Sequence, residues 1–259
     1  MVRQTGPGVA VVTVALLLGS VGCGGQGIGD GKGGDRPGAT ATPSTGPSGP
    51  SSSPQASSSP QASPSGDDAK PVAGDVLPGM VSAAVARTQL AALTVGKPGT
   101  MAGYSRAKFT HWAEQGNKCD TRETVLKRDG ANVSQDSECR AVSGNWKSLY
   151  DGESVTEAAK LDIDHMVPLA EGWRSGAAGW DAAKRKAFAN DLTRPQLLAV
   201  SASSNRSKGD QSPDQWQPTD RSSWCQYGRA WTTVKSHYGL TVTEAERATL
   251  TTMIDTCAS

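Results

Sequence analysis

The sequence predicts an α+β domain in the larger, C-terminal part of the chain, and three observations lead to this class. In Leu161–His165, apolar and acidic residues alternate, which is the pattern of a half-buried strand. The apolar run Leu197–Val200 is long enough for a second short strand, and the polar residues after it can begin a helix. Elsewhere apolar residues recur at helical spacing, so we expect the rest of the domain to be mostly helical.

The first 23 residues have the features of a signal peptide. The apolar run Val9–Leu18 follows Arg3 and is shorter than the roughly 20 residues needed to span a bilayer. Small residues before Cys23 indicate a lipobox, although Ser20 stands where an aliphatic residue is usual. We therefore expect export, with Cys23 lipidated and holding the chain on the outer membrane face. Plain secretion and a retained anchor are the alternatives.

Residues 24–75 are rich in Gly, Ser, Pro and Thr and almost free of large apolar residues. Such a segment cannot bury enough surface to offset its ordering entropy, so it is expected to be a disordered spacer. Residues 76–259 remain as one folded domain. From Met80 onward there are 22 Lys and Arg against 20 Asp and Glu, a net charge of +2. This balance excludes a strongly basic packaging protein and leaves nucleic-acid contact to local clusters.

Four cysteines follow Cys23, and an even number in an exported chain predicts two disulfides. Three pairings are possible, and we favour Cys119–Cys139 with Cys225–Cys257 because each closes a local loop within one half of the domain. A zinc site is the competing interpretation. The spacings contain no Cys-x-x-Cys pair, and an oxidising compartment disfavours free thiolates.

Helical spacing, breakers and caps place further elements along the chain. Glu123–Arg128 could form a helix or a strand, and the turn-rich stretch from Ser143 to Gly152 is compatible with a hairpin. The expected helices are Val81–Leu93, Asp181–Ala189, one from Trp224 that packs its tryptophans into the core, and a last one opened by the capping box Thr243-x-x-Glu246.

Two short motifs occur in the order strand, loop, strand, helix. The first is Asp164-His165 with Pro168, and the second is Asn205-Arg206-x-Lys208-x-Asp210. Together they resemble the signature of the HNH (ββα-metal) nucleases, in the branch whose last letter is Asn. The resemblance is closest to secreted actinobacterial proteins of the GmrSD C-terminal (DUF1524-like) group, with the motif spanning 161–210.

This resemblance implies a ββα-metal core inside a mostly helical, disulfide-stapled domain. It implies His165 as the general base, since a neutral imidazole can accept a proton near neutral pH. Asp164 and Asn205 would ligate one divalent cation, Mg²⁺ in first place with Mn²⁺ or another ion as alternatives, because such cations prefer oxygen ligands. Asp162 shares a strand face with Asp164 and would support it.

One position departs from the family pattern. The family's middle Asn, which orients the histidine through its backbone, falls here on Gln196, and the nearest true Asn is Asn190. Gln196 is the slightly preferred candidate. Three basic residues are expected either to support the site or to bind phosphate: Arg122, Arg206 and Lys208.

The basic run Lys184–Lys186 is either a solvated helix face or a site of phosphate steering. His111 and His237 have no comparable setting and are expected to be surface or structural residues.

The leading hypothesis is an exported, metal-dependent HNH endonuclease that cleaves DNA with low sequence specificity, with RNA as an open alternative. Its partners are nucleic acid and, through the lipid, the membrane, and no protein partner is evident. The alternative is a catalytically impaired HNH-scaffold lipoprotein that binds nucleic acid at the cell envelope. A purely structural surface protein is disfavoured because the candidate catalytic and metal-binding residues occur together.

Overall fold

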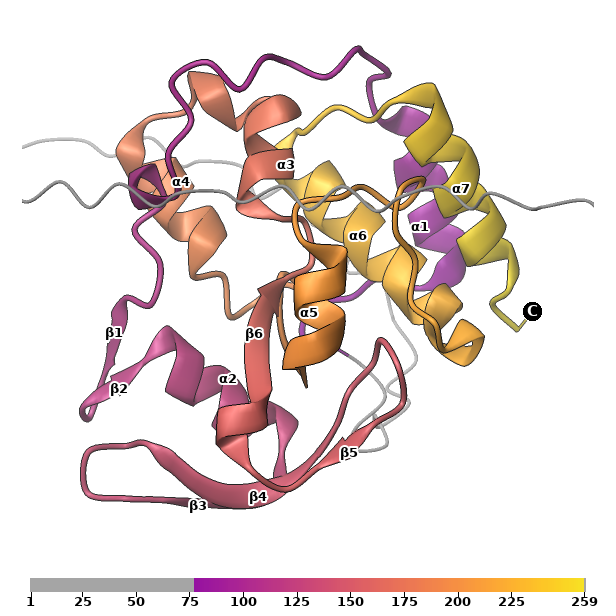
Figure 1. The fold of residues 1–259 in the computed structure, drawn as a ribbon. Coiled ribbons are helices and arrows are strands. Elements are labelled where there is room, and N and C mark those ends of the chain that lie inside the picture. Colours follow the sequence, from indigo (N-terminus) through magenta and orange to yellow (C-terminus); the bar gives the residue numbers. More distant parts are fainter. Residues whose placement is uncertain (1–76, 259) are drawn as a thin grey trace, which may run out of the picture. The chain divides into compact units, whose positions relative to one another are not determined.

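The computed structural model describes residues 77–258, and they form an α+β unit, as predicted (Figure 1). The predicted leader with Cys23 and the spacer 24–75 lie outside the described residues. The α-helices are α1 (Ala83–Ala92), α2 (Thr121–Asp129), α3 (Leu169–Arg174), α4 (Ala182–Ala189), α5 (Ala202–Lys208), α6 (Trp224–Tyr238) and α7 (Glu244–Asp255). The strands are β1 (Glu114–Gly116), β2 (Cys119–Asp120), β3 (Ala131–Gln135), β4 (Ala141–Lys147), β5 (Ser154–Val155), β6 (Leu161–His165) and β7 (Leu197–Ser201).

The strands form three small antiparallel sheets. The pair β6–β7 carries Asp164 and His165 of the first motif at the end of β6, and the second motif begins in α5, which follows β7. In this pair Asp164 lies opposite Leu198, and α5 begins directly after β7 and packs on both strands. The predicted order of strand, long loop, strand and helix is therefore found in the chain. The long loop contains the expected α4 and also α3, a helix that begins directly after Pro168 and was not expected.

The two faces of β6 have different surroundings. Leu161 and Ile163 are buried in an apolar cluster that includes Val125 and Trp146. Burying side chains of this size stabilises the fold by about 1.5–3 kcal/mol each. The alternate residues of the strand therefore point to the opposite face, where α5 lies (Figure 1).

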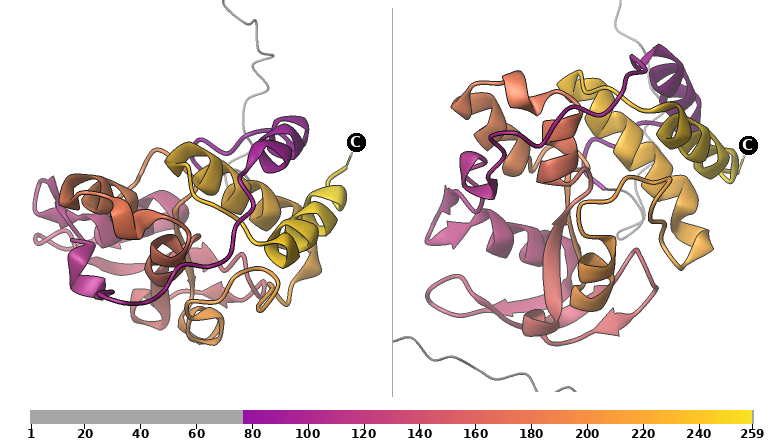
Figure 2. Two further views of the ribbon diagram at one scale, coloured as in Figure 1. Left: turned by 90° about the horizontal axis from the view of Figure 1, so that it is seen from above. Right: turned by 45° about the horizontal axis from the view of Figure 1, so that its top comes forward.

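Helices α1, α6 and α7 lie side by side and bury the larger apolar core (Figure 2). Trp231 of α6 is fully buried, as predicted, and the Thr243–Glu246 capping box is present at the start of α7. Glu123–Arg128, which the sequence allowed to be either a helix or a strand, is part of helix α2. The Asp120 carboxylate caps this helix by accepting a hydrogen bond from the Glu123 amide. Within residues 77–258, no helix combines the length and the apolar character needed to cross a membrane.

Both predicted disulfides are present. Cys119–Cys139 joins β2 to the turn between β3 and β4, and Cys225–Cys257 joins the start of α6 to the segment after α7. With all four cysteines paired in this way, the zinc alternative is excluded.

Candidate active site

The acidic residues of β6 meet the polar residues of α5 in two successive contacts. The Asn205 side-chain amide donates to Asp162 Oδ2 at 3.0 Å, and Lys208 Nζ donates to Asp164 Oδ2 at 2.6 Å. Residues two apart share a strand face and residues three apart share a helix face, so these four side chains are paired in register. The two acidic residues of the strand, two positions apart, thus contact two polar residues of the helix that are three positions apart.

Asp164 is almost completely buried and its Oδ2 atom accepts two hydrogen bonds. Besides Lys208, the donor is the Tyr150 hydroxyl at 2.5 Å. Lys208 is fully buried and also donates to the His165 carbonyl oxygen at 2.9 Å. Burial lowers the pKa of Lys208, and the charge of Asp164 opposes that effect. Of the two roles considered for Lys208, support of the site and phosphate binding, this buried contact favours support of Asp164.

The His165 side chain lies in a different environment from that of Asp164. Its Nε2 atom is 2.9 Å from the Ala189 carbonyl oxygen, and the Trp112 ring lies over it with the ring centroids 5.7 Å apart. Because a carbonyl oxygen only accepts hydrogen bonds, Nε2 carries the proton and Nδ1 keeps a free lone pair. Burial lowers the pKa of His165 to about 3, so the imidazole is neutral at pH 7.

Asn190 is bonded through every polar atom of its side chain. Its Oδ1 accepts from the Ala113 amide and the Thr121 hydroxyl, both at 2.8 Å, and its Nδ2 donates to the Thr110 and Lys186 carbonyl oxygens. These bonds fix the backbone beside Ala189, whose carbonyl contacts His165. They also hold the segment on either side of Trp112.

Gln196 has a different position from the one expected. It is fully buried, and its side-chain amide makes two hydrogen bonds to the backbone of Val167, at 3.1 and 2.9 Å. Its own carbonyl accepts from the Met166 amide at 2.7 Å. Gln196 therefore holds the chain just after β6. The backbone carbonyl that contacts the His165 ring is that of Ala189, the residue before Asn190.

The other predicted basic residues differ in exposure, since Arg122 is half-buried and Arg206 is exposed. Arg122 pairs with Glu123 at 2.6 Å and donates to the carbonyl oxygens of Ala158 and Leu161, so it supports the start of β6. Arg206 is exposed on α5 and could meet a phosphate.

In the basic run of α4, Lys184 and Arg185 bond to backbone carbonyls, and Lys186 is exposed. His111 contacts the edge of Trp112, and His237 is exposed beside Tyr238.

Two residues next to the site were not predicted from the sequence. Tyr150 and Asp151 belong to the turn between β4 and β5, where the only signal in the sequence was turn-forming composition. Their partners are 14 residues and 50 or more residues away in the chain. Short-range patterns carry no information about contacts at that separation.

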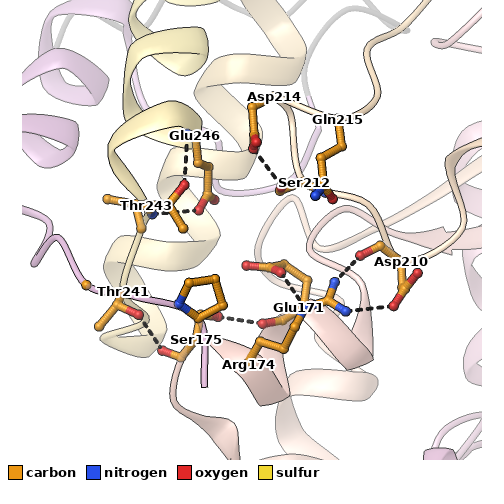
Figure 3. Close-up of a pocket in the computed structure, with 13 residues that line it drawn as sticks. Glu171, Arg174, Ser175, Asp210, Ser212, Asp214, Gln215, Thr241, Thr243 and Glu246 are labelled. Atoms are coloured by element: carbon orange, nitrogen blue, oxygen red, sulfur yellow. Dashed lines mark hydrogen bonds and ion pairs between the residues drawn. The ribbon is translucent and has the colours of Figure 1, made fainter. Parts of the chain in front are cut away.

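A polar pocket of about 280 Å³ lies between α3, α7 and the segment after α5 (Figure 3). Arg174 pairs with Glu171 and with Asp210, the last residue of the second motif. Lys235 is buried between Glu171 and Glu246, at 2.9 and 2.7 Å. The main charges are paired with one another, and none of Asp164, His165 and Asn205 lines the pocket. We therefore regard it as part of the scaffold.

Asp164 on β6 and Asn205 on α5 offer oxygen atoms of the kind that a hard divalent cation takes as ligands. Asp164 and Asn205 are hydrogen-bonded through Oδ2 and Nδ2, and their Oδ1 atoms receive no hydrogen bond from the described residues. Among residues 77–258 there is no group of three or more His, Cys, Asp or Glu placed to hold a metal. A cation such as Mg²⁺, which keeps several waters and takes one or two protein ligands, fits this sparse donor set.

Comparison with known proteins gives two findings. Residues 120–253 match the family described as GmrSD restriction endonucleases, C-terminal domain. A protein of Arthroderma benhamiae described as an uncharacterized secreted protein is 50% identical over 189 residues, which cover 73% of this chain and 93% of that protein. No solved structure matches the chain.

The family match covers just over half of the chain, including both motifs and all of the candidate catalytic, metal-binding and phosphate-binding residues. A restriction endonuclease domain is a nuclease, a hydrolase of phosphodiester bonds, and nucleic acid is the substrate of that class. The chain therefore belongs to the family of GmrSD restriction endonuclease C-terminal domains.

Proposed function

We propose that this protein is an exported, metal-dependent endonuclease of the HNH type that hydrolyses DNA with low sequence specificity. The observation that carries the proposal is the β6–β7–α5 unit, with Asp164 and Asn205 between strand and helix and a neutral His165 at the strand end. The family match supports the nuclease class.

In the proposed mechanism His165 Nδ1 accepts the proton of the attacking water. The Ala189 carbonyl holds the opposite ring nitrogen and so fixes the direction of Nδ1. Asp164 and Asn205 would hold one divalent cation, with Mg²⁺ the first candidate, through their unbonded oxygens. The bound ion would neutralise charge on the scissile phosphate and on the leaving 3′ oxygen. Asp162 keeps the Asn205 amide nitrogen turned toward the strand.

The histidine is only 4% exposed, and the Trp112 ring packs against it. Trp112 has a φ of 57°, in the left-handed region that a bulky side chain rarely adopts. Such strain costs on the order of 1–3 kcal/mol and is common at functional sites. We propose that Trp112 moves aside when substrate binds.

Export is proposed from the leader in residues 1–23, the two disulfides and the relative that is described as secreted. Lipidation of Cys23 would keep the chain at the membrane surface. Both disulfides require an oxidising compartment to persist.

The test is cleavage of supercoiled plasmid by the purified protein with Mg²⁺ or Mn²⁺. His165→Ala should lower the nicking rate by at least 100-fold, whereas the control His237→Ala, at an exposed histidine, should retain it. Full activity in His165→Ala contradicts the mechanism. Single-stranded DNA and RNA in the same assay define the substrate.

A second candidate is a lipoprotein that binds nucleic acid without turnover. It is favoured by Gln196 at the position of the middle Asn and by the burial of His165. This candidate predicts binding without cleavage under every divalent metal, and binding that Asn205→Ala leaves unchanged. Metal-dependent nicking by the wild type excludes it.

A further inference from the structure

We infer that the Tyr150–Asp151 turn is a positioning element that sets the metal-binding oxygen of Asp164 and the start of α5. The inference rests on the proposed function, because it concerns the same two cation ligands. The turn joins β4 to β5, and two consecutive residues in it reach the strand and the helix of the site.

Tyr150 is held rigidly enough to direct its hydroxyl group. The residue is fully buried, and its ring packs edge-on against Trp216 and Tyr227 with centroids 5.0 and 5.7 Å away. Its carbonyl oxygen accepts from the Asp220 amide at 3.1 Å and from the Thr219 hydroxyl at 3.3 Å. The hydroxyl position is therefore fixed by packing on one side and by backbone bonds on the other.

The contact from Tyr150 determines which oxygen of Asp164 stays available. Tyr150 and Lys208 both donate to Oδ2, at 2.5 and 2.6 Å, and such donors to a carboxylate make strong hydrogen bonds. With Oδ2 occupied twice, Oδ1 alone can meet a cation, and the carboxylate cannot rotate without breaking both bonds. Tyr150 thus makes Asp164 a one-oxygen ligand with a fixed orientation.

Asp151 fixes the other half of the site. Its Oδ2 atom accepts from the hydroxyls of Ser201 and Ser204, both at 2.5 Å. Ser201 is the N-cap of α5, and Ser204 directly precedes Asn205. Because one short turn holds both elements, it sets the separation between Asp164 and Asn205.

The test compares Tyr150→Phe with Tyr227→Phe in the full chain. Tyr227 is a neighbouring buried tyrosine whose hydroxyl has no hydrogen-bond partner among residues 77–258, so it is a matched control. Mn²⁺ binding is measured directly by calorimetry, and plasmid nicking is measured as a function of Mn²⁺ concentration. Asp151→Asn tests the other arm of the turn and serves as a second variant if Tyr150→Phe does not fold.

We expect Tyr150→Phe to weaken Mn²⁺ binding about tenfold, in line with other residues that support metal ligands. Nicking at saturating Mn²⁺ should recover to near the wild-type rate, whereas a merely structural role would lower folded yield without moving the half-saturating concentration. Tyr227→Phe should bind Mn²⁺ like the wild type. Unchanged Mn²⁺ affinity in folded Tyr150→Phe, or in Asp151→Asn where only that variant folds, overturns the inference.

The two proposals fail in distinguishable ways. A wild-type protein that binds Mn²⁺ with the expected loss in Tyr150→Phe, yet cleaves no nucleic acid, supports the positioning role and refutes the nuclease. A wild type that binds no Mn²⁺ refutes both.

Discussion

Asp164 and His165 are consecutive residues whose side chains have different tasks and different neighbours. Asp164 is bonded to Tyr150 and Lys208, while His165 contacts Ala189 and the ring of Trp112. A strand end produces this division because successive side chains point to opposite faces. The proposed base and the proposed metal ligand can therefore be tuned separately.

Removal of the Trp112 ring should expose His165 to water. In Trp112→Ala the pKa of His165 should rise from about 3 toward the ordinary 6.5, because burial is the main cause of the lowering. The pH titration of imidazole signals by NMR measures this directly, and the chain has only 3 histidines.

The control is Trp180→Ala, since Trp180 packs on Phe188 and Tyr238 instead. In Trp180→Ala the NMR signal of the His165 imidazole should show no pH-dependent shift above pH 5. The same result in Trp112→Ala would show that other groups keep His165 buried.

At the scale of elements, one buried carboxylate links the loop between α4 and β7 to α6. Asp191 accepts from the Tyr238 hydroxyl at 2.8 Å and from the Thr193 amide at 2.9 Å, and it pairs with Arg194. It thereby ties the segment that precedes β7 to the end of α6. This anchoring keeps β7, and with it α5, in place beside β6.

Asp191→Asn should destabilise the fold more at pH 7 than in acid. Burial by itself raises the pKa of this carboxyl, but hydrogen bonds from Tyr238 and Thr193 outweigh burial and hold the pKa below the ordinary 3.8. The folded state therefore favours the ionised form, and its contribution is full above about pH 4 and lost as the pH falls further.

We expect a loss of about 1–3 kcal/mol at pH 7, measured by urea unfolding with the disulfides intact. The difference from wild type should shrink at pH 3. Asp255→Asn is the control, because its salt bridge with Arg87 is exposed and contributes little. An effect of Asp191→Asn that is equal at both pH values contradicts the assignment.

At the scale of the whole described domain, the two disulfides brace different halves. Cys225–Cys257 closes 32 residues across the helical core, and Cys119–Cys139 closes 20 residues beside β2. Cys119 is two residues before Thr121, whose hydroxyl bonds to Asn190. Asn190 directly follows Ala189, whose carbonyl contacts His165, so the Cys119–Cys139 disulfide is connected to the histidine through these contacts. We therefore expect the two disulfides to stabilise the fold to a similar extent, and only Cys119–Cys139 to affect the activity.

Replacing either cysteine pair with serine should lower the free energy of unfolding by about 3–4 kcal/mol, from the entropy of the opened loop. Only the Cys119→Ser, Cys139→Ser double variant should also reduce plasmid nicking under conditions where the protein stays folded. Urea unfolding and the nicking assay at 25 °C separate the two effects. Equal nicking by the two folded double variants would rule out the link to His165.

Much of the fold followed from local signals in the sequence. Alternation predicted β6, the capping box predicted the start of α7, and loop length predicted both disulfide pairings. Helix α3 was missed because its six residues follow Pro168 and are too few to show a helical period. The sequence did not show whether the ammonium group of Lys208 is buried or in solvent, so both site support and phosphate binding were considered for it.

The sequence by itself determined the strand, loop, strand and helix order around the two motifs, the favoured disulfide pairing and the motifs themselves, since each depends on residues close together in the chain. Only the tertiary structure decided that Lys208 is buried against Asp164, that Ala189 contacts His165 beside Asn190, and that Tyr150 reaches Asp164. Burial and hydrogen bonding between distant residues depend on how the elements pack, and no local pattern specifies that packing.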